Sequence, residues 1–550
     1  MPTGAELFVR TLAQLEIPQL FTLVGDHLNE VLVEAARAGV RIVDMRHESA
    51  VVHAADSLAR LTRKPALTLV TGGPGHTNSL TGIATAYLNC SPVIAVSGSL
   101  ATNSADRGAF QDIEQVDMTH PIVKWAARPP SPAQIPFYLG RAYNEANTGR
   151  KGPVHLTIPV DVFTAQTEQC SNAPAPLDGP VTAPDPRRIA ETIAALKSAR
   201  HPVIIAGSGI WWADACDELR RFAELTLLPV YTITLAKGAI SDEHPLCLGY
   251  ADPALNKAVH KAFKEADLFL VLGKRIDYRL ALGGPRLFSP AARFIQVDIH
   301  PQELGLNRKL EIGICADVKS TLEALLAEAA KEKWKPLPWL EQLRAWKAEW
   351  EGQLAEYTRS TMSPLHPAAF FAEFKKWSPK NLLYSWDGGD VVHWGRATHR
   401  MTEPGRWLRL GPLGTIGAGL PNGLAMQLAN PGKPVAVITG DGSLGFYIAE
   451  MDSAVRHKLP IVIVVGNDAG WGIERELQGG GQTVACELRR TQYDLVMQGF
   501  GGGGETIDTL DQVRPAVERA FASGIPYCLN VNVSGVRSPF TEWQIAGKKK

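Results

Sequence analysis

The stretches that decide the fold are residues 435–443, Val-Ala-Val-Ile-Thr-Gly-Asp-Gly-Ser, and residues 461–470, Ile-Val-Ile-Val-Val-Gly-Asn-Asp-Ala-Gly. Each starts as a short apolar run of the kind that forms a buried strand, and each ends in a glycine turn that carries acidic side chains. Residues 446–458 between them have room for a crossover helix, which makes the two strands parallel. Their carboxyl ends then face one crevice, where open α/β sheets bind ligands.

Asp441 and Asp468 are predicted to meet in this crevice and to share one divalent cation. Carboxylate oxygens suit Mg²⁺, which typically bridges protein carboxylates to phosphate groups. Backbone N–H groups of Gly442, Ser443 and Gly445, near a helix N-terminus, are expected to bind the same phosphates, with Gly440 in the same cofactor-binding turn. An isolated Gly-Asp-Gly turn is usually ordinary loop structure. The second acidic pair, 27 positions later at the end of another apolar run, favours the metal and phosphate site.

These motifs resemble those of the thiamine-diphosphate-dependent decarboxylases and carboligases, whose signature is Gly-Asp-Gly followed by Asn-Asn or a similar pair. The resemblance implies thiamine diphosphate and Mg²⁺ as cofactors. It also implies that Asp441, Asp468 and the backbone carbonyl of Gly470 hold the metal ion. This chain departs from the family in having Asp468 where a second asparagine is common.

Glu48 lies at a predicted strand-to-helix junction, ahead of a helix rich in alanine. A glutamate that opens a helix commonly only complements the helix dipole. In the family, a glutamate at this place hydrogen-bonds the pyrimidine N1′ of the cofactor and promotes loss of the thiazolium C2 proton, for which a buried acid is needed. Glu48 is therefore a predicted catalytic residue. The nearby residues Gly73, Pro74, Gly75 and Asn78 match the family's glycine-rich turn, which approaches the aminopyrimidine.

Two further segments are similar to cofactor-binding parts of the family. Gly414 and Ile416 belong to a loop, residues 411–417, whose bulky apolar residue props the cofactor into its bent shape. That role is positional, and simple core packing is the alternative for Ile416. Trp471 directly follows the loop that carries the predicted metal ligands Asp468 and Gly470. In the family, the segment after this loop usually sets substrate specificity.

The reaction is expected to depend on His27 and Gln111. Benzaldehyde lyase has a histidine in a similar Gly-x-His context, and Gln111 matches a glutamine shared across the carboligases. A neutral imidazole could shuttle the hydroxyl proton when a carbon–carbon bond is made or broken, while Gln111 would donate to the substrate oxygen. The alternative for His27 is a histidine that only caps a helix or forms a turn. The alternative for Gln111 is a residue on the surface of a helix.

Over its whole length the chain most resembles the 2-hydroxyacyl-coenzyme A lyases, with oxalyl-coenzyme A decarboxylase, benzaldehyde lyase and acetolactate synthase as relatives. We expect a carbon–carbon lyase or carboligase that acts on a 2-hydroxyacyl-coenzyme A or a 2-hydroxyketone through an enamine-type intermediate. The first alternative is a decarboxylating synthase of the acetolactate synthase type, against which residues 474–478 count because they lack that group's Gln-Trp-Gln segment. The second alternative is a catalytically silent regulatory homologue, which would be expected to lose Glu48 or Asp441.

Length predicts three domains, and the alternation of strand and helix patterns predicts that each is an α/β unit with a doubly wound parallel sheet. At 550 residues the chain is too long for one ordinary domain. Two polar, proline-containing transitions divide it. The expected units are an N-terminal pyrimidine-binding domain, a middle domain and a C-terminal diphosphate-binding domain, at residues 1–170, 185–335 and 360–550.

Charge and cysteine content limit the expected partners and location. The 56 basic and 56 acidic residues balance, which argues against nucleic acid as a partner. Seven scattered cysteines fit neither a metal site nor a disulfide framework. Without a leader pattern or a long apolar run, we expect a cytoplasmic protein with no membrane partner.

Comparison with the family also leads to expectations about FAD, the oligomeric state and coenzyme A. Residues 248–253 are unlike the FAD-binding segment of acetolactate synthases, so no FAD is predicted. Because cofactor sites in this family lie between subunits, a homodimer or homotetramer is expected. An acyl-coenzyme A substrate would need cations for its phosphates, and the candidates are Lys274, Arg275, Arg279 and the three C-terminal lysines. The alternative for the C-terminal lysines is a solvated tail.

Overall fold

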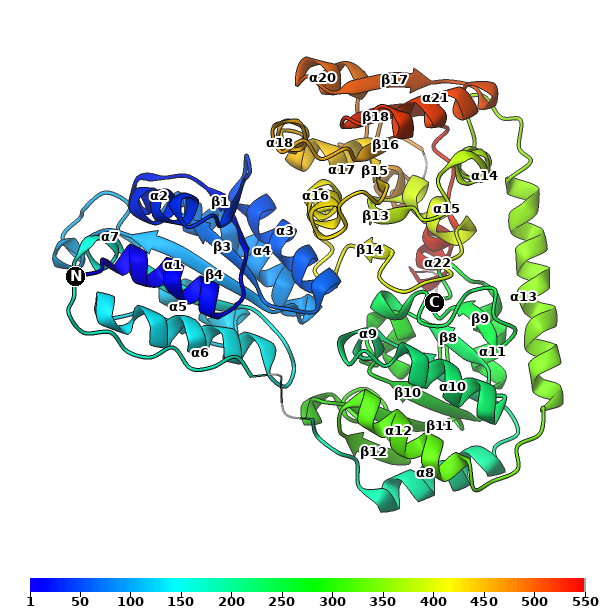
Figure 1. Ribbon diagram of the computed structural model, residues 1–550. Helices are drawn as coiled ribbons and strands as arrows, with labels where there is room; N and C mark the ends of the chain where they lie inside the picture. Colours follow the sequence, from blue (N-terminus) through cyan, green and yellow to red (C-terminus); the bar gives the residue numbers. More distant parts are fainter. Residues whose placement is uncertain (178, 180, 480, 549–550) are drawn as a thin grey trace.

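The computed structural model describes residues 1–177, 179, 181–479 and 481–548, and it consists of three α/β units. Each unit contains a six-stranded sheet in which the neighbouring strands run parallel. Figure 1 shows the N-terminal unit in blue and cyan, the middle unit in green and the C-terminal unit in yellow to red. The predicted fold class, three doubly wound parallel-sheet domains, is confirmed.

The N-terminal sheet has the strand order β2-β1-β3-β4-β6-β5. Its strands are β1 (Gln19–Leu23), β2 (Arg41–Asp44), β3 (Ala66–Val70), β4 (Val93–Ser99), β5 (Ala126–Ala127) and β6 (Val154–Pro159). Its helices are α1 (Gly4–Gln14), α2 (Asn29–Arg37), α3 (Glu48–Thr62), α4 (Pro74–Asn89), α5 (Gln115–Thr119), α6 (Ile135–Asn147) and α7 (Val160–Thr164).

The C-terminal sheet, in the order β14-β13-β15-β16-β18-β17, repeats the same strand order counted from its own first strand. Its strands are β13 (Leu383–Asp387), β14 (Trp407–Arg409), β15 (Val435–Gly440), β16 (Val462–Asn467), β17 (Gly503–Ile507) and β18 (Tyr527–Asn532). Its helices are α14 (Pro367–Trp377), α15 (Asp390–Thr398), α16 (Gly419–Ala429), α17 (Asp441–Leu444), α18 (Glu450–Arg456), α19 (Gly472–Leu477), α20 (Tyr493–Gly499), α21 (Leu510–Ala522) and α22 (Pro539–Lys548).

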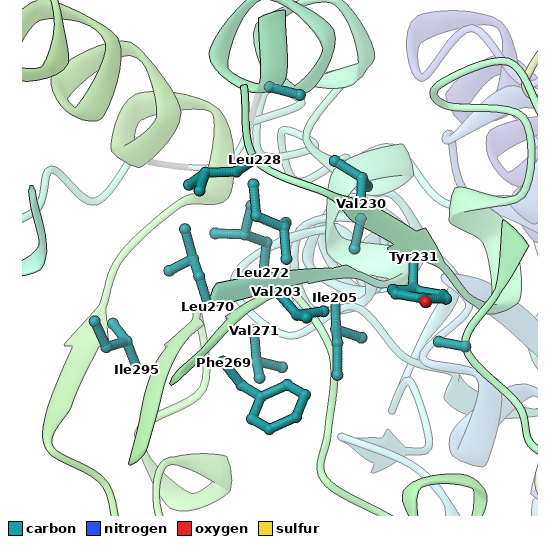
Figure 2. Close-up of a cluster of buried hydrophobic side chains, with 14 of the residues drawn as sticks. Val203, Ile205, Leu228, Val230, Tyr231, Phe269, Leu270, Val271, Leu272 and Ile295 are labelled. Atoms are coloured by element: carbon teal, nitrogen blue, oxygen red, sulfur yellow. The ribbon is translucent and has the colours of Figure 1, made fainter. Parts of the chain in front are cut away.

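The middle sheet has the order β12-β11-β10-β7-β8-β9. Its central strands β7 (Pro202–Ala206) and β10 (Leu268–Leu272) are buried on both faces, as expected for a parallel sheet covered by helices. Figure 2 shows their side chains packed with those of neighbouring strands. The other elements are α8 (Pro186–Ser198), α9 (Ser208–Trp212), α10 (Cys216–Thr226), β8 (Val230–Thr232), β9 (Cys247–Tyr250), α11 (Ala258–Glu265), β11 (Arg293–Asp298), β12 (Ile312–Cys315) and α12 (Val318–Ala329).

Helix α13 (Pro338–Tyr357) and helix α22 connect the middle and C-terminal units. Figure 1 shows α13 along the outer side of both units and α22 between them. Thr541 of α22 donates to Asp390 at 2.6 Å, and Lys257 of the middle unit pairs with Glu542 at 2.7 Å. No helix in the described ranges is long and apolar enough to cross a bilayer.

The predicted crossover helix at residues 446–458 is wrong in its limits. Helical turns already begin at Asp441 with α17, continue as a 3-10 turn at Gly445–Tyr447, and resume in α18. The early start has a local cause, because Gly440 is extended and directly precedes the first helical residue. The acidic turn therefore lies at the beginning of a helix.

Helix α3 is buried almost all round, because it lies between the N-terminal sheet and the C-terminal unit. Its residues from Glu48 to Arg60 are all buried, and a single hydrophobic cluster joins it to α16. Ser57 donates to Asn422 of α16 at 2.5 Å, and Thr85 of α4 lies 3.0 Å from Thr415. A helix buried on every side has its position set by tertiary packing.

We expect Gly82→Ala in α4 to destabilise the fold by roughly 1–3 kcal/mol, the usual cost of overpacking a core. A Cβ at Gly82 would come within 2.5 Å of Val52 Cβ and 3.0 Å of the Ser49 carbonyl oxygen in α3. The measurement is the shift in the urea midpoint of unfolding.

The matched control is Gly352→Ala in α13, where a Cβ would meet nothing within 4 Å. Alanine is the better helix former by about 1 kcal/mol, so this variant should be neutral or slightly stabilised. Equal midpoints for the two variants would contradict close packing between α3 and α4.

Candidate functional site

A cavity of about 150 Å³ opens at the carboxyl ends of β13, β15 and β16 in the C-terminal unit. These strands lie at and beside the point where the strand order reverses, which is where open α/β sheets bind ligands. Its wall consists of Gly388, Gly389, Asp390, Val391, Ile416, Gly440, Asp441, Gly442, Ser443, Asp468, Gly470, Trp471, Gly472, Ile473 and Glu474. The crevice predicted between the two acidic turns therefore exists.

The predicted metal ligands are brought together in this cavity. The Gly470 N–H donates to Asp441 Oδ2 at 3.1 Å, and the Gly442 N–H donates to Asp441 Oδ1 at 2.9 Å. Burial raises the pKa of Asp441, and burial together with the neighbouring Asp441 carboxylate raises the pKa of Asp468 to about 7. Two desolvated carboxyl groups of like charge are stabilised by a cation between them.

The donor set fits a hard divalent cation held partly by a diphosphate. Asp441 and Asp468 offer carboxylate oxygens, and Gly470 offers a backbone carbonyl beside them. Within the described ranges no three His, Cys, Asp or Glu side chains form a metal-binding group. Mg²⁺ fits such a site, because it commonly takes one or two carboxylates and completes its coordination with phosphate oxygens and water.

The other predicted residues of this half of the site divide into those that line the cavity and one that does not. Gly440, Gly442, Ser443, Ile416 and Trp471 line it. The Trp471 indole covers Gly442 so closely that a Cβ at Gly442 would lie 2.8 Å from the ring. The exception is Gly414, which has a left-handed φ of 76° in the loop before Ile416 and is absent from the wall.

A second group of predicted residues surrounds the turn between β3 and α4 in the N-terminal unit. Gly73 has a left-handed φ of 60°, and a Cβ there would lie 2.7 Å from Gln111 Cβ. Gly75 faces Glu48, whose Oε1 would be 3.5 Å from a Cβ at that glycine. Pro74 is the first residue of α4. This turn therefore lies against two of the three predicted catalytic side chains, Gln111 and Glu48.

Glu48 is buried at the start of α3, as the sequence predicts. Asn78 Nδ2 of α4 donates to Glu48 Oε2 at 3.0 Å. The buried Glu450 carboxylate of the C-terminal unit accepts the Arg46 N–H at 3.1 Å and so holds the chain just before α3. The helix-dipole interpretation alone does not account for an acid that is enclosed in this way.

His27 lies on the other side of the same turn. It is buried, and its Nδ1 is 2.9 Å from Thr71 Oγ1 and 3.3 Å from the Gly72 nitrogen, whose N–H points toward it. A Cβ at Gly72 would lie 3.3 Å from the His27 ring. The imidazole therefore packs against the backbone of the turn.

Gln111 is in a turn, with a left-handed φ of 64°, and is not on a helix surface. Its Oε1 atom is buried and has no hydrogen-bond partner among the described residues. A buried polar atom without a partner costs free energy, so the position is suited to a ligand that supplies one. The orphaned oxygen beside Gly73 fits a polar cofactor or substrate at this turn.

Two residues of the site, Gln115 and Asp390, were not predicted from the sequence. Gln115 is fully buried; its Oε1 accepts the Gly73 N–H at 3.0 Å and its Nε2 donates to the Gly98 carbonyl at 3.0 Å. Only the spacing of four residues between Gln115 and Gln111 could have drawn attention to Gln115.

Asp390 lines the cavity, and its carboxylate accepts hydrogen bonds from the Ser538 N–H and the Thr541 hydroxyl. Asp390 follows an apolar strand and two glycines, a pattern comparable to that before Asp441.

Glu48, His27 and Gln111 are absent from the described lining of the 150 Å³ cavity. Every described residue that lines the 150 Å³ cavity comes from the C-terminal unit. Glu48, His27 and Gln111 are grouped around the N-terminal turn instead. The structure thus assembles each predicted half.

A larger cavity, of about 310 Å³, lies where the N-terminal unit, the middle unit and residues 409–412 meet. The candidate coenzyme A cations Lys274, Arg275 and Arg279 line it. Lys274 pairs with Asp277 at 2.5 Å and Arg279 with Asp252 at 3.0 Å, while Arg275 donates to the Leu88 carbonyl at 2.8 Å. All three cations have protein partners. Of the C-terminal lysines, residues 549 and 550 lie outside the described residues.

Comparison with known proteins links these two half-sites to one cofactor. Three family models match in chain order: the thiamine pyrophosphate enzyme N-terminal TPP binding domain at residues 2–118, the central domain at residues 189–325 and the C-terminal TPP binding domain at residues 387–531. The first match contains Glu48, His27 and Gln111, and the last contains Asp441 and Asp468.

Curated relatives align over nearly their whole length. A probable acetolactate synthase of Mycobacterium bovis is 32% identical over 96% of this chain and 95% of its own. The 2-hydroxyacyl-CoA lyase 2 of Caenorhabditis elegans is 31% identical over 99% and 91%, and the oxalyl-CoA decarboxylase of Escherichia coli is 29% identical over 96% and 95%. With every unit of the fold matched in order, this chain belongs to the thiamine pyrophosphate enzymes and is a thiamine-diphosphate-dependent enzyme.

Proposed function

We propose that the protein is a carbon–carbon lyase or carboligase that acts on a 2-hydroxyacyl-coenzyme A or a 2-hydroxyketone. The observation that carries this proposal is the grouping of His27, Gln111 and Glu48 around one turn, residues 71–75. An imidazole at the same turn as the glutamate that would bind the pyrimidine suits a reaction in which a substrate hydroxyl gains or loses a proton. A relative named as a 2-hydroxyacyl-CoA lyase at 31% identity supports the same reading.

In the C-terminal half, Asp441, Asp468 and the Gly470 carbonyl would hold Mg²⁺, and Gly440, Gly442 and Ser443 would receive the diphosphate. Thiamine diphosphate, when bound, supplies a nucleophilic thiazolium carbon. Ile416 and Trp471 would pack against the cofactor from the cavity wall. The oxygen donors and the buried, like-charged carboxylates support Mg²⁺ over softer metals.

In the N-terminal half, Glu48 would hold a proton at the pyrimidine N1′, while Gly73, Pro74, Gly75 and Asn78 enclose the ring. Asn78 keeps the Glu48 carboxyl oriented through its hydrogen bond. The Gly72 N–H points at His27 Nδ1, so Nε2 is the ring nitrogen left to exchange a proton with the substrate hydroxyl. Gln111 would bind a substrate oxygen or hydroxyl through its side-chain amide.

The alternative is a decarboxylating synthase of the acetolactate synthase type. It is supported by the 32% identity to a protein named as a probable acetolactate synthase. Residues 474–478, of which Glu474 lies in the cavity wall, favour the lyase because they lack the Gln-Trp-Gln segment of acetolactate synthases.

We also propose that FAD is not a cofactor, and that the domains span residues 1–170, 185–335 and 360–550.

We propose that the protein is at least a homodimer, in which the N-terminal half-site of one chain covers the C-terminal cavity of its partner. Large apolar side chains beside both half-sites support this arrangement. Phe110, next to Gln111, is 79% exposed, Val24 near His27 is 61% exposed, and Phe446 near the metal turn is 54% exposed. Exposed apolar residues grouped at a functional site are typical of an interface.

The test of the reaction is turnover of protein loaded with thiamine diphosphate and Mg²⁺, with product mass and CO₂ followed together. We expect benzaldehyde and formyl-coenzyme A to give a 2-hydroxyacyl-coenzyme A without CO₂. Release of CO₂ and formation of acetolactate from pyruvate alone would identify the synthase instead. Cofactor binding without turnover of either substrate set would support a silent homologue.

Glu48→Gln should lower kcat by roughly 10²- to 10⁴-fold, the range typical of a lost acid–base group, because the amide cannot share a proton with the pyrimidine. Calorimetric titration should still show thiamine diphosphate binding, because the metal and diphosphate ligands remain. Glu30→Gln, on the exposed surface of α2, is the matched control and should leave kcat unchanged. Full activity of Glu48→Gln would remove Glu48 from the mechanism.

Phe110→Asp and Phe446→Asp should each convert the protein to a monomer in light-scattering measurements and weaken thiamine diphosphate binding. Burying a charged group at an apolar interface is unfavourable. Leu306→Asp, at a middle-unit residue that is 67% exposed, is the control and should not change the mass. A monomeric wild-type protein that binds the cofactor tightly would contradict the shared site.

A further inference from the structure

The Arg475 side chain lies against the loop that carries the predicted metal ligands. It extends from α19 and places Nη1 3.9 Å from Asp468 Oδ2 and Nη2 3.4 Å from the Ala469 carbonyl oxygen. Its Nε and Nη2 donate to the two carboxylate oxygens of Glu487 at 3.0 and 3.1 Å. One guanidinium therefore connects the metal loop with Glu487.

Two glycines leave the space that this guanidinium occupies. A Cβ at Gly470 would lie 2.0 Å from Arg475 Nη2, and a Cβ at Gly535 would lie 2.9 Å from Nη1. The same Cβ at Gly535 would lie 3.3 Å from Asp468 Oδ2, so Gly535 is adjacent to both partners of the ion pair. Side chains at these positions would push the guanidinium away from Asp468.

The backbone fixes Glu487 opposite the metal loop. The Trp471 N–H donates to the Cys486 carbonyl at 2.8 Å, and the Leu488 N–H donates to the Ala469 carbonyl at 2.8 Å. Gly470 and Glu487 form an antiparallel bridge between these bonds. Glu487 is thus held where it binds Arg475 in a two-point pair, an arrangement with defined geometry.

The ionisable side chains among the described residues that line the cavity are all acidic. Asp390, Asp441, Asp468 and Glu474 line it, and no Lys, Arg or His is among the described lining residues. Among all described residues, Arg475 is the one cation within 4.0 Å of any of the three aspartates, through Asp468. A charge at this range, partly shielded from water, has a large effect on ion binding.

We propose that Arg475 sets the net charge of the metal and diphosphate site, with Glu487 holding its guanidinium in place. This inference rests on the Mg²⁺ site of the proposed function and assigns a specific role to a residue that is outside the ligand set. Arg475 offsets the Asp468 carboxylate and so balances attraction for the cation against repulsion of the diphosphate. Residues behind the ligands commonly change metal affinity about 10- to 100-fold.

The alternative is that Arg475 only clamps the loop, and the two roles predict opposite signs. If it sets the charge, Arg475→Gln makes the cavity more negative, so a divalent cation binds more tightly and the diphosphate more weakly. If it only clamps, the same variant loosens the loop and weakens both. The direction of the change in cation affinity therefore separates the two roles.

The experiment measures the affinity for Mn²⁺, an oxygen-seeking substitute for Mg²⁺, from the electron paramagnetic resonance signal of the free ion, with and without thiamine diphosphate. Calorimetry gives the thiamine diphosphate affinity. For Arg475→Gln we expect Mn²⁺ binding about tenfold tighter and thiamine diphosphate binding about tenfold weaker, by the size of outer-shell effects. Asp468→Asn should shift both in the opposite direction. The double variant Asp468→Asn/Arg475→Gln has the same net charge at the site as wild type, so both affinities should move back toward the wild-type values.

Glu487→Gln provides a second variant that should fold normally, because the Glu487 side chain is 65% exposed. It removes the partner that holds the Arg475 guanidinium beside Asp468, so Mn²⁺ binding should change in the same direction as in Arg475→Gln, by a smaller factor. Arg537→Gln is the matched control, since Arg537 pairs with Glu476 on the same helix α19 at 2.9 Å and should not alter Mn²⁺ affinity. Circular dichroism checks the fold of every variant.

Two outcomes overturn the inference in distinguishable ways. If wild type binds Mn²⁺ and Arg475→Gln binds it equally or more weakly, without recovery in the double variant, Arg475 does not set the charge. If wild type binds no Mn²⁺ even with thiamine diphosphate present, the proposed metal site is wrong and this inference falls with it.

Discussion

The parallel pairing of β15 with β16 is the constraint on which the site depends. Its register places Gly440 opposite Gly466, so Asp441 and Asp468 leave the same edge of the sheet. Burial then makes their negative charge costly, and each pKa is raised as a result. A cation bound between the two carboxylates would relieve that cost. The proposed metal site therefore depends on the register of β15 and β16.

The N-terminal and C-terminal units are joined through a helix that is buried along almost its whole length. Helix α3 is packed between the N-terminal sheet and α16 of the C-terminal unit, and Glu48 is its first residue. The position of Glu48 thus follows from a domain interface as much as from its own strand and turn. In the same way Asp390 connects the cavity wall to α22 through Ser538 and Thr541.

Most of the fold and each half of the site were predictable, because they depend on local patterns. Apolar runs that end in glycine and acid predicted the strands and the turns at Asp441 and Asp468, and the glycine turn predicted the surroundings of Glu48. Gln115 and Asp390 were missed because their importance comes from contacts with distant segments, Gly98 in one case and Ser538 in the other. The helix at 446–458 was misplaced because helical turns already begin at Asp441.

By itself, the sequence determined the three parallel sheets, since strand periodicity and turn chemistry act over a few neighbouring residues. Its motifs resembled those of one cofactor family, and the residues of each half-site were predicted from that resemblance. Only the tertiary structure decided how these parts combine. It grouped His27, Gln111 and Glu48 around one turn, left them out of the described lining of the acidic cavity, and placed Arg475 between Asp468 and Glu487. The physical reason is that burial, electrostatic compensation and cavity walls arise from residues far apart in the chain, which packing alone brings into contact.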